Sequence, residues 1–320
     1  MKIPWKAIGL ILLRTGITAL AFWWVLRQVK LADFLELLRS ASRFWILVSV
    51  ALFFVTQLGC VLRWSLLVPA HPKLTFPFLL NSYFVGAFFN TFLPTTVGGD
   101  VVRGYDLIKI TGEWRTSLAS VLMDRLLGFT GFLIFALGAW CLFPPAHHDP
   151  LIRTGFAAFC GLVVVTFTVL GSRRVLRTLL TPFGKIGLGQ LESHAKQFQE
   201  ALRSYLQRPG RLFGTLLVTA GIQVVAILMF AALSRALGLE IPLVYLFLVV
   251  PMILTISQVP VSLNGWGIRE WATVLFLKPI GVSAHEALSL SLIGAMIPLL
   301  GGLLGAVLFL ARQRRKPKPA

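Results

Sequence analysis

The sequence predicts an all-α, polytopic membrane protein of about 6–8 transmembrane helices in two inverted repeats, each with a Pro/Gly-rich re-entrant motif. Of its 320 residues 57% are hydrophobic and 13% are charged, and the mean hydropathy is +0.82. Soluble domains are about 45–50% apolar and about 25% charged. Apolar runs long enough to cross a bilayer recur along the chain. Two shorter runs end in related sequences, which is typical of transporters with internal repeats.

The basic charge balance fits a membrane protein better than a nucleic-acid-binding protein. The chain has 30 Lys+Arg against 12 Asp+Glu, a formal net charge of +18. These cations lie mostly in loops and at the C-terminus, as expected for cytoplasmic segments that face anionic lipids. We therefore expect membrane lipids as partners, no nucleic acid, and a multi-pass location in a bacterial plasma (inner) membrane.

Eight apolar segments follow one another along the chain. A helix needs about 20 residues to cross the bilayer core, and the third and seventh segments are shorter and run into Pro/Gly-rich sequence. The first is interpreted as a retained span, because no clear cleavage site precedes the polar sequence after it. The approximate bounds are 5–26, 44–68, 76–93, 117–143, 153–171, 211–236, 243–260 and 284–310.

The polar connections contain two amphipathic stretches, 31–38 and 188–206. Each fits a helix lying at the membrane interface, and an ordinary surface helix fits equally well. Neither is large enough for a soluble catalytic domain. We expect one transmembrane domain over 1–311 and a basic tail, 312–320, that anchors the topology.

The two shorter segments end in matching motifs. Aligning their prolines also aligns a hydroxyl, a glycine and an arginine, and the repeats would then cover about 1–143 and about 153–310. The matched pairs are Pro94 and Pro260, Thr96 and Ser262, Gly99 and Gly265, and Arg103 and Arg269.

Each motif predicts a re-entrant hairpin with a helix after its glycines. Proline breaks a helix, and glycine permits tight turns and close approach to a ligand. Irregular backbone at membrane depth is tolerated only where protein or a wet cavity surrounds it. A helix start after Gly98–Gly99 or after Gly267 would offer free N–H groups to an anion. The alternative is an ordinary interfacial loop that turns at Pro and Gly.

Re-entrant motifs leave three spans in each half. An odd number of spans makes the two repeats inverted, so that one motif enters from each face. With the N-terminus inside, this arrangement places more Lys and Arg on the inner side than an arrangement in which all eight segments span, and the positive-inside rule therefore favours it.

Charged residues also fall inside apolar segments, where they are costly and usually functional or paired. Arg14 and Arg63 are expected to reach toward an interface or to form structural pairs. Asp124 and Arg125 are adjacent and point about 100° apart on a helix, so they can pair with different helices. A buried structural pair and a part in a transport path are equally open for them.

The sequence contains only weak signals for a catalytic or metal-binding site. His147-His148-Asp149 resembles a metal cluster but lacks a second ligand group, and no nucleotide fingerprint occurs. We expect no metal and no cofactor. The glycines Gly301, Gly302 and Gly305 predict close helix packing in the last segment.

Three signatures along the chain resemble those of a known family. They are Asn90-Thr91-Phe92-Leu93-Pro94 with Gly98, Gly99, Asp100 and Arg103; Asp124-Arg125 with Gly128; and Pro260-Val261-Ser262 with Gly265, Gly267, Arg269 and Glu270. The sequence is similar, over nearly its whole length, to the lysylphosphatidylglycerol synthase transmembrane region family, which includes the flippase module of aminoacyl-phospholipid synthases and stand-alone membrane proteins.

The resemblance implies a lipid translocase for an anionic or aminoacylated phospholipid or a related amphiphilic lipid. In the bifunctional relatives a separate soluble domain aminoacylates the lipid, and no such domain is expected here, so a translocase is favoured over an enzyme. Stand-alone members are associated with hopanoid, glycolipid or polyprenyl-linked pathways, which leaves the lipid open.

The expected lipid site combines both motifs and the Asp124–Arg125 pair. Arg103 and Arg269 would hold an anionic phosphate from the two faces, and the carboxylates would pair with them, bind a cationic head group or carry a proton. One alternative is a membrane-embedded enzyme acting on a lipid phosphate or polyprenyl-linked sugar. Another is a non-catalytic subunit of a lipid-modifying synthase or glycosyltransferase. The candidate residues are Asn90, Pro94, Gly98, Gly99, Asp100, Arg103, Asp124, Arg125, Pro260, Ser262, Gly265, Gly267, Arg269 and Glu270.

Overall fold

The computed structural model describes residues 39–92, 98–171, 209–259 and 264–314, together with residues 205, 207 and 262. Within these residues all regular structure is helical, which confirms the predicted all-α class. The elements are α3 (Arg43–Leu67), α4 (Phe76–Phe92), α5 (Gly98–Thr111), α6 (Trp114–Leu142), α7 (Pro145–His148), α8 (Pro150–Gly171), α11 (Pro209–Ala236), α12 (Leu243–Ser257), α13 (Ile268–Leu277), the 3-10 turn η2 (Lys278–Ile280) and α14 (Ala284–Arg314).

Five of the described helices are long and apolar enough to cross a membrane, namely α3, α6, α8, α11 and α14. They coincide with five of the predicted spans, so the chain is a multi-pass membrane protein. The helices α4, with 17 residues, and α12, with 15, are shorter. At 1.5 Å per residue they reach about 26 and about 23 Å, less than the roughly 30 Å hydrocarbon core. The expected span 5–26, the stretch 31–38 and nearly all of 188–206 lie outside the described residues.

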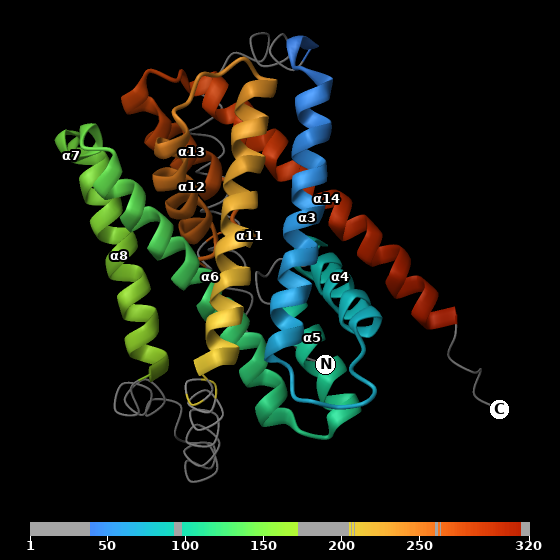
Figure 1. Ribbon diagram of the computed structural model, residues 1–320. Coiled ribbons are helices and arrows are strands. Elements are labelled where there is room, and N and C mark those ends of the chain that lie inside the picture. The colour runs from blue at the N-terminus through green and yellow to red at the C-terminus, as the bar shows by residue number, and fades with distance from the viewer. Residues whose placement is uncertain are drawn as a thin grey trace, which may run out of the picture.

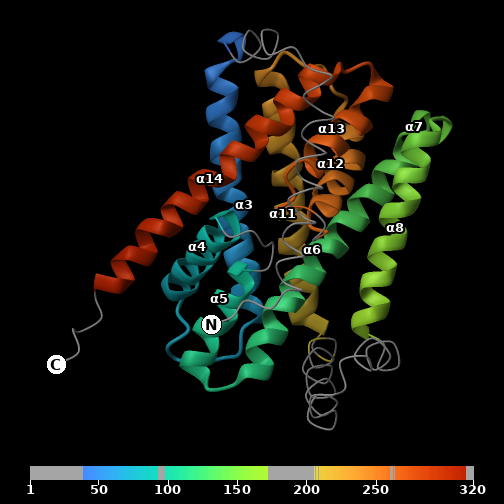
Figure 2. The same cartoon turned by 180° about the vertical axis from the view of Figure 1, so that it is seen from behind.

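The two short helix pairs each return to the end of the bundle from which they start (Figures 1 and 2). In Figure 1, α3 ends and α6 begins at the lower end, and α4 and α5 run between these two points. At the upper end α11 ends and α14 begins, and α12 and α13 connect them there. The pair α4–α5 and the pair α12–α13 therefore enter the bundle from opposite ends.

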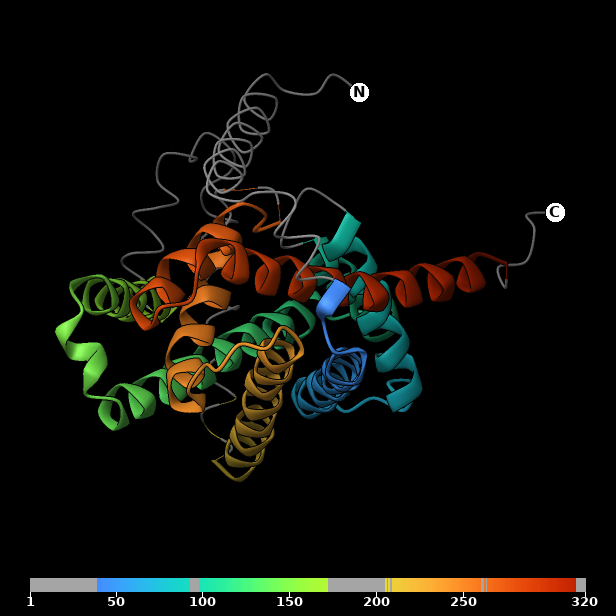
Figure 3. The ribbon, with the colours of Figure 1, turned by 90° about the horizontal axis from the view of Figure 1, so that it is seen from above.

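The packing of the first half recurs in the second half. When α3, α4, α5 and α6 are exchanged with α11, α12, α13 and α14, each main contact maps onto another. The helix α3 packs against its own counterpart α11, and α4 packs against α14 as α12 packs against α6. The same holds for α5 with α6 and α13 with α14. Figure 3, seen from above, shows α3 and α11 side by side.

The two halves are also in register along the chain. Pro260 lies 166 positions after Pro94 (260 − 94). Moved by the same 166 positions, the start of α3 falls on Pro209, where α11 begins, and the end of α5 falls on Leu277, where α13 ends. The separation found in the motif sequences is thus the separation of the helices.

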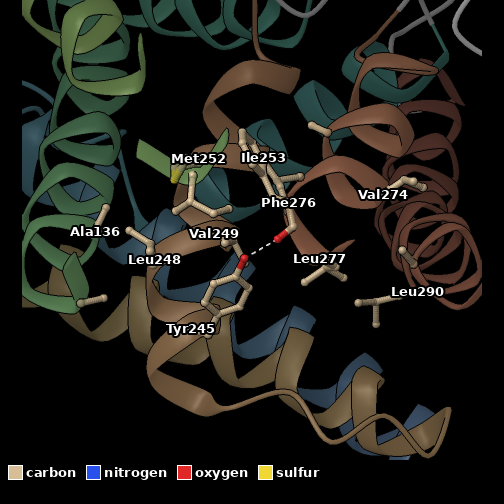
Figure 4. Packing of buried hydrophobic residues seen from close by; sticks show 14 of the residues in the cluster. Ala136, Tyr245, Leu248, Val249, Met252, Ile253, Val274, Phe276, Leu277 and Leu290 are labelled. Atoms are coloured by element: carbon tan, nitrogen blue, oxygen red, sulfur yellow. Dashed lines mark hydrogen bonds between the residues drawn. The ribbon is translucent and has the colours of Figure 1, made fainter. Parts of the chain in front are cut away.

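The largest buried apolar cluster of the described residues anchors the α12–α13 pair. Tyr245 of α12 donates its hydroxyl hydrogen to the main-chain carbonyl of Phe276 on α13, and both side chains are buried (Figure 4). The helix α8 packs closely against Phe276, because a Cβ at Gly155 would lie 2.5 Å from Cε1 of this ring. The second hairpin is therefore held on several sides by tightly packed side chains.

The glycines of α14 allow α4 to pack closely against it, as predicted. A Cβ at Gly302 would lie 2.9 Å from the Thr91 hydroxyl oxygen, and a Cβ at Gly305 would overlap the Phe84 carbonyl oxygen. The helix also runs further than expected. Arg312, assigned above to the basic tail, lies within α14 and pairs with Asp106 of α5 at 2.7 Å.

Candidate functional site

A chain of five alternating charges lies between α3, α5 and α6. Arg63 of α3 donates from Nε to Oδ1 of Asp124 on α6 at 2.7 Å. Arg103 of α5 donates to the other oxygen of Asp124 at 3.1 Å and to Asp100 at 2.6 Å. Arg125 of α6 also donates to Asp100. We call these five residues, three cations and two anions, the Arg103 cluster.

The Arg103 cluster is largely closed to solvent. Arg63 and Arg103 are each 6% exposed, Asp100 is 7% exposed and Asp124 is 3% exposed. Charges at this depth are tolerated only when they are paired and hydrogen-bonded, so the alternation of sign is what permits the cluster. The side chain of Arg125 is the most open of the five, at 25%. As predicted, Asp124 and Arg125 point to different partners although they are neighbours in sequence.

Two aromatic rings fix the position of the Arg103 guanidinium. Its central carbon lies 5.0 Å from the ring centre of Trp64 and 4.8 Å from that of Tyr83. Cations are attracted to such ring faces at these distances. Trp64 is buried, and its Nε1–H has no hydrogen-bond partner within the described residues. Arg103 is therefore held by two carboxylates and two rings rather than extending freely.

The first motif brings α5 into backbone contact with α4. The N–H of Gly99 donates to Oδ1 of Asn90 at 2.6 Å. A Cβ at Gly99 would overlap the carbonyl oxygen of Gly86. The helix α5 begins at Gly98, so it contains the two glycines rather than starting after them as predicted, and Pro94 lies outside the described residues. In this conformation Gly99 permits helix contact rather than the expected approach to a ligand.

The second motif holds a separate and neutral ion pair. Glu270 has no exposed surface, and its Oε1 accepts from Arg269 at 2.6 and 3.0 Å. The Gly267 N–H donates to the other oxygen at 2.6 Å, and the Ser291 hydroxyl of α14 donates to Oε1 at 3.3 Å. The Arg269 guanidinium also lies 4.9 Å from the Trp266 ring centre. Glu270 thus closes the start of α13 and holds its own arginine.

The backbone of this second motif depends on its glycines. Gly265 and Gly267 have φ of +78° and +81°, a region that favours glycine, and Asn264 has φ of +52°. A Cβ at Gly265 would lie 2.6 Å from the Ser257 carbonyl oxygen. The Ser262 hydroxyl is buried without a hydrogen-bond partner among the described residues. Pro260 falls outside them.

The two motifs meet at the end of α4. The Asn264 side chain donates from Nδ2 to the carbonyl oxygen of Thr91 at 3.4 Å, and Thr91 directly follows Asn90 of the first motif. The two arginines nevertheless belong to separate ion-pair groups, since Arg103 pairs with α5 and α6 and Arg269 pairs with its neighbour Glu270.

A cavity of about 300 Å³ adjoins the Arg103 cluster between α3, α4, α5 and α14. This is the low end of the range for ligand pockets, enough for a lipid head group. It contains two of the expected residues, Asn90 and Arg103. Most of the others carry no signal in the sequence, because their shared position depends on how four helices pack. The lining residues are Phe53, Gln57, Tyr83, Gly86, Ala87, Asn90, Thr91, Arg103 and Pro298.

The histidine-rich loop has structural contacts. The His147 ring lies 4.3 Å from that of Trp140, and the Asp149 carboxylate accepts from the backbone N–H groups of Leu151 and Ile152 at the start of α8. Within the part of the chain that the structure describes, no three His, Cys, Asp or Glu side chains gather as metal ligands do.

The residues of this site all lie in the part of the chain that is similar to known proteins. The family profile described as the lysylphosphatidylglycerol synthase TM region matches residues 11–306. A UPF0104 membrane protein of Methanothermobacter thermautotrophicus is 24% identical over 317 residues, which cover 91% of this chain and 91% of that protein. Both motifs and the Asp124–Arg125 pair fall inside the matched residues.

Proposed function

Since the chain belongs to the lysylphosphatidylglycerol synthase transmembrane region family, we propose that it translocates an anionic or aminoacylated phospholipid, or a related amphiphilic lipid, between membrane leaflets. We propose a bacterial plasma membrane as its location; the relative named above is archaeal. A lipid-modifying synthase or glycosyltransferase is the class of partner that would supply or use the lipid.

The observation that carries the proposal is the Arg103 cluster beside a cavity. The cluster lies inside a bundle of membrane-spanning helices, and Arg103 is the only charged residue among the described ones that line the cavity. An anionic group at the cavity would balance this charge. Intramembrane ionisable residues usually mark a substrate or ion path. A lipid phosphate would enter at Arg103, where it competes with a carboxylate for the guanidinium, while the acyl chains stay among the lipids.

The arrangement of the hairpins supports a transport role. The pairs α4–α5 and α12–α13 are short, return to their own ends of the bundle, and lie in matching positions of two halves. We propose that they are re-entrant and that the halves are inverted repeats. Secondary transporters place their substrate sites at such broken helices. The neutral Arg269–Glu270 pair then positions the second hairpin.

The enzyme alternative receives less support from the site. Asp100, Asp124 and Glu270 each accept hydrogen bonds from arginine. A general base must be within reach of the proton that it removes, and these oxygens are occupied by guanidinium groups. The translocase therefore remains the function that the geometry favours.

Leaflet-resolved lipid movement in proteoliposomes tests the proposal. Labelled anionic and aminoacylated phospholipids would be compared for wild type, Arg103→Ala, Arg269→Ala and the exposed control Arg153→Ala. We expect movement above empty liposomes that falls about tenfold or more in Arg103→Ala, as for loss of a charge-assisted contact, and that Arg153→Ala retains. Folded wild type that moves none of the lipids would contradict the proposal, and conversion of a lipid in detergent micelles would support the enzyme.

A further inference from the structure

Two glutamines occupy matching positions in the two halves. Gln223 of α11 lies 166 positions after Gln57 of α3 (223 − 57), the separation that also relates the motif prolines. Both residues lie near the middle of their helices, and these two helices pack against each other. The repeat therefore makes Gln57 and Gln223 counterparts, but their surroundings differ.

Gln223 lies at a closed contact between α11 and α6. It is 3% exposed and donates from Nε2 to the carbonyl oxygen of Gly128 at 3.1 Å. Nearby on α6, a Cβ at Gly131 would lie 2.7 Å from Cγ2 of Thr219 and 2.9 Å from Cγ of Gln223. The glutamine amide thus joins the two helices where side chains of α11 pack against Gly131.

Gln57 lies at an open contact. It lines the cavity beside Arg103, and its amide makes no hydrogen bond to the described residues. The nearby Asn90 uses its oxygen for the Gly99 N–H, which leaves its NH₂ group for the cavity. A half-buried amide without a partner is costly at membrane depth. The NH₂ groups of Gln57 and Asn90 and the Arg103 guanidinium therefore line a space that fits a hydrogen-bond acceptor.

The repeat also indicates what Gln57 binds when this contact closes. Gly294 of α14 lies 166 positions after Gly128 (294 − 128), so its carbonyl is the counterpart of the one that Gln223 uses. Four residues later Pro298 has no N–H, so the Gly294 carbonyl lacks its ordinary helix donor. Pro298 lines the same cavity as Gln57. An acceptor for the Gln57 amide is thus available on the neighbouring helix.

We propose that Gln57 responds to the ligand. Its amide donates to a phosphate oxygen of an anionic head group when the cavity is occupied, and to the Gly294 carbonyl when the cavity closes. The bond from Gln223 to the Gly128 carbonyl is made while the cavity is open and is broken when the cavity closes. One half therefore closes as the other opens. This proposal rests on the proposed function for the lipid nature of the ligand.

The charge of the site selects the head group. Among the described residues that line the cavity, Arg103 is the only charged one, and the amides of Gln57 and Asn90 can donate to phosphate oxygens. A head group that carries an ammonium group would add a second positive charge there. The ligand is therefore an anionic phospholipid, in preference to an aminoacylated one.

Thiol labelling in the cavity tests the alternation. Ala87→Cys would be placed in a background with Ala at Cys60, Cys141 and Cys160, and its alkylation rate measured in permeabilised membranes. Gln223→Met removes the bond that closes the second half, so labelling should slow about fivefold, as for loss of one hydrogen bond. Adding Gln57→Met removes the opposite bond and should restore the rate.

The labelling rates can contradict the proposed alternation of the two halves. A Gln223→Met rate equal to wild type, or a double variant as slow as Gln223→Met alone, would overturn it. The exposed Gln207→Met is the matched control and should not change the rate. A thermal unfolding midpoint for every variant excludes a damaged fold as the cause. The assay needs no transport, so absent lipid movement with these rates intact would reject the proposed function alone.

Protection from labelling tests the ligand. Short-chain phosphatidylglycerol should protect the thiol introduced by Ala87→Cys at lower concentration than inorganic phosphate, and choline should not protect. Protection by phosphatidylglycerol should weaken about fivefold in Gln57→Met, as for loss of one hydrogen bond. Equal protection by phosphate and lipid would overturn the lipid ligand, stronger protection by choline would overturn the anionic one, and unchanged protection in Gln57→Met would overturn the role of Gln57.

Discussion

The substitution Asp124→Asn tests whether the Arg103 cluster holds the fold together through its charge balance. Asp124 accepts from Arg63 at 2.7 Å and from Arg103 at 3.1 Å, and it is 3% exposed. Asparagine keeps the size of the side chain but removes the negative charge. In this variant Arg103 keeps Asp100 as a partner at 2.6 Å, whereas Arg63 loses the carboxylate with which it pairs.

The magnitude follows from the one guanidinium that loses its counter-charge. Breaking a buried ion pair by removing one partner costs about 3–5 kcal/mol. At about 1.4 kcal/mol per tenfold change, this lowers the folding equilibrium constant by roughly 100-fold or more. Replacing both members with apolar residues removes the uncompensated charge. Arg63→Met/Asp124→Leu should therefore be more stable than Asp124→Asn, although it lacks more polar contacts.

The assay is equilibrium unfolding of the purified protein in mixed detergent micelles. Asp149→Asn is the matched control, because asparagine caps a helix N-terminus as well as aspartate does, and it should change the unfolding free energy by less than about 0.5 kcal/mol. If Asp124→Asn unfolds like wild type, or if the double variant is less stable than Asp124→Asn, the charge-balance reasoning is refuted.

Three further predictions use the same unfolding assay. Gly99→Ala should cost about 1–3 kcal/mol, because its Cβ overlaps the backbone of α4, and a neutral result would contradict the close contact. Gly265→Ala should cost about 1–2 kcal/mol for its φ of +78°. Their shared control, Gly138→Ala, meets no atom within 4 Å and should be neutral or stabilising by up to about 1 kcal/mol. Arg312→Met should cost at most about 1 kcal/mol and less at high salt, so a larger, salt-independent loss would argue against a partly exposed pair.

The spans and the motif helices were predictable because their signals are local. Length and hydropathy locate α3, α6, α8, α11 and α14 close to their observed bounds. Glycines after a proline-containing turn locate the starts of α5 and α13. The pairing of two motifs by sequence alone also yields the 166-position separation at which the helices recur.

The partners within the site were less predictable because they depend on helix crossings. Asp124 was singled out, but its contact with Arg63 requires knowing that α3 crosses α6 at this height. Gln57 carries no local signal, and only the repeat shift that relates it to Gln223 could have found it. Gly99 was expected to lie at the ligand, yet it contacts α4. The sequence does not separate these two roles, because glycine permits close approach both to a ligand and to a neighbouring helix.

Lipid translocation is tested most directly by the rate at which labelled phosphatidylglycerol changes leaflets in proteoliposomes. We expect wild type to move this lipid faster than empty liposomes do, and we expect Arg103→Ala to remove the difference while Arg153→Ala keeps it. A well-folded wild type that leaves the lipid in its original leaflet, or an Arg103→Ala variant that moves it at the wild-type rate, would contradict translocation at the Arg103 cluster.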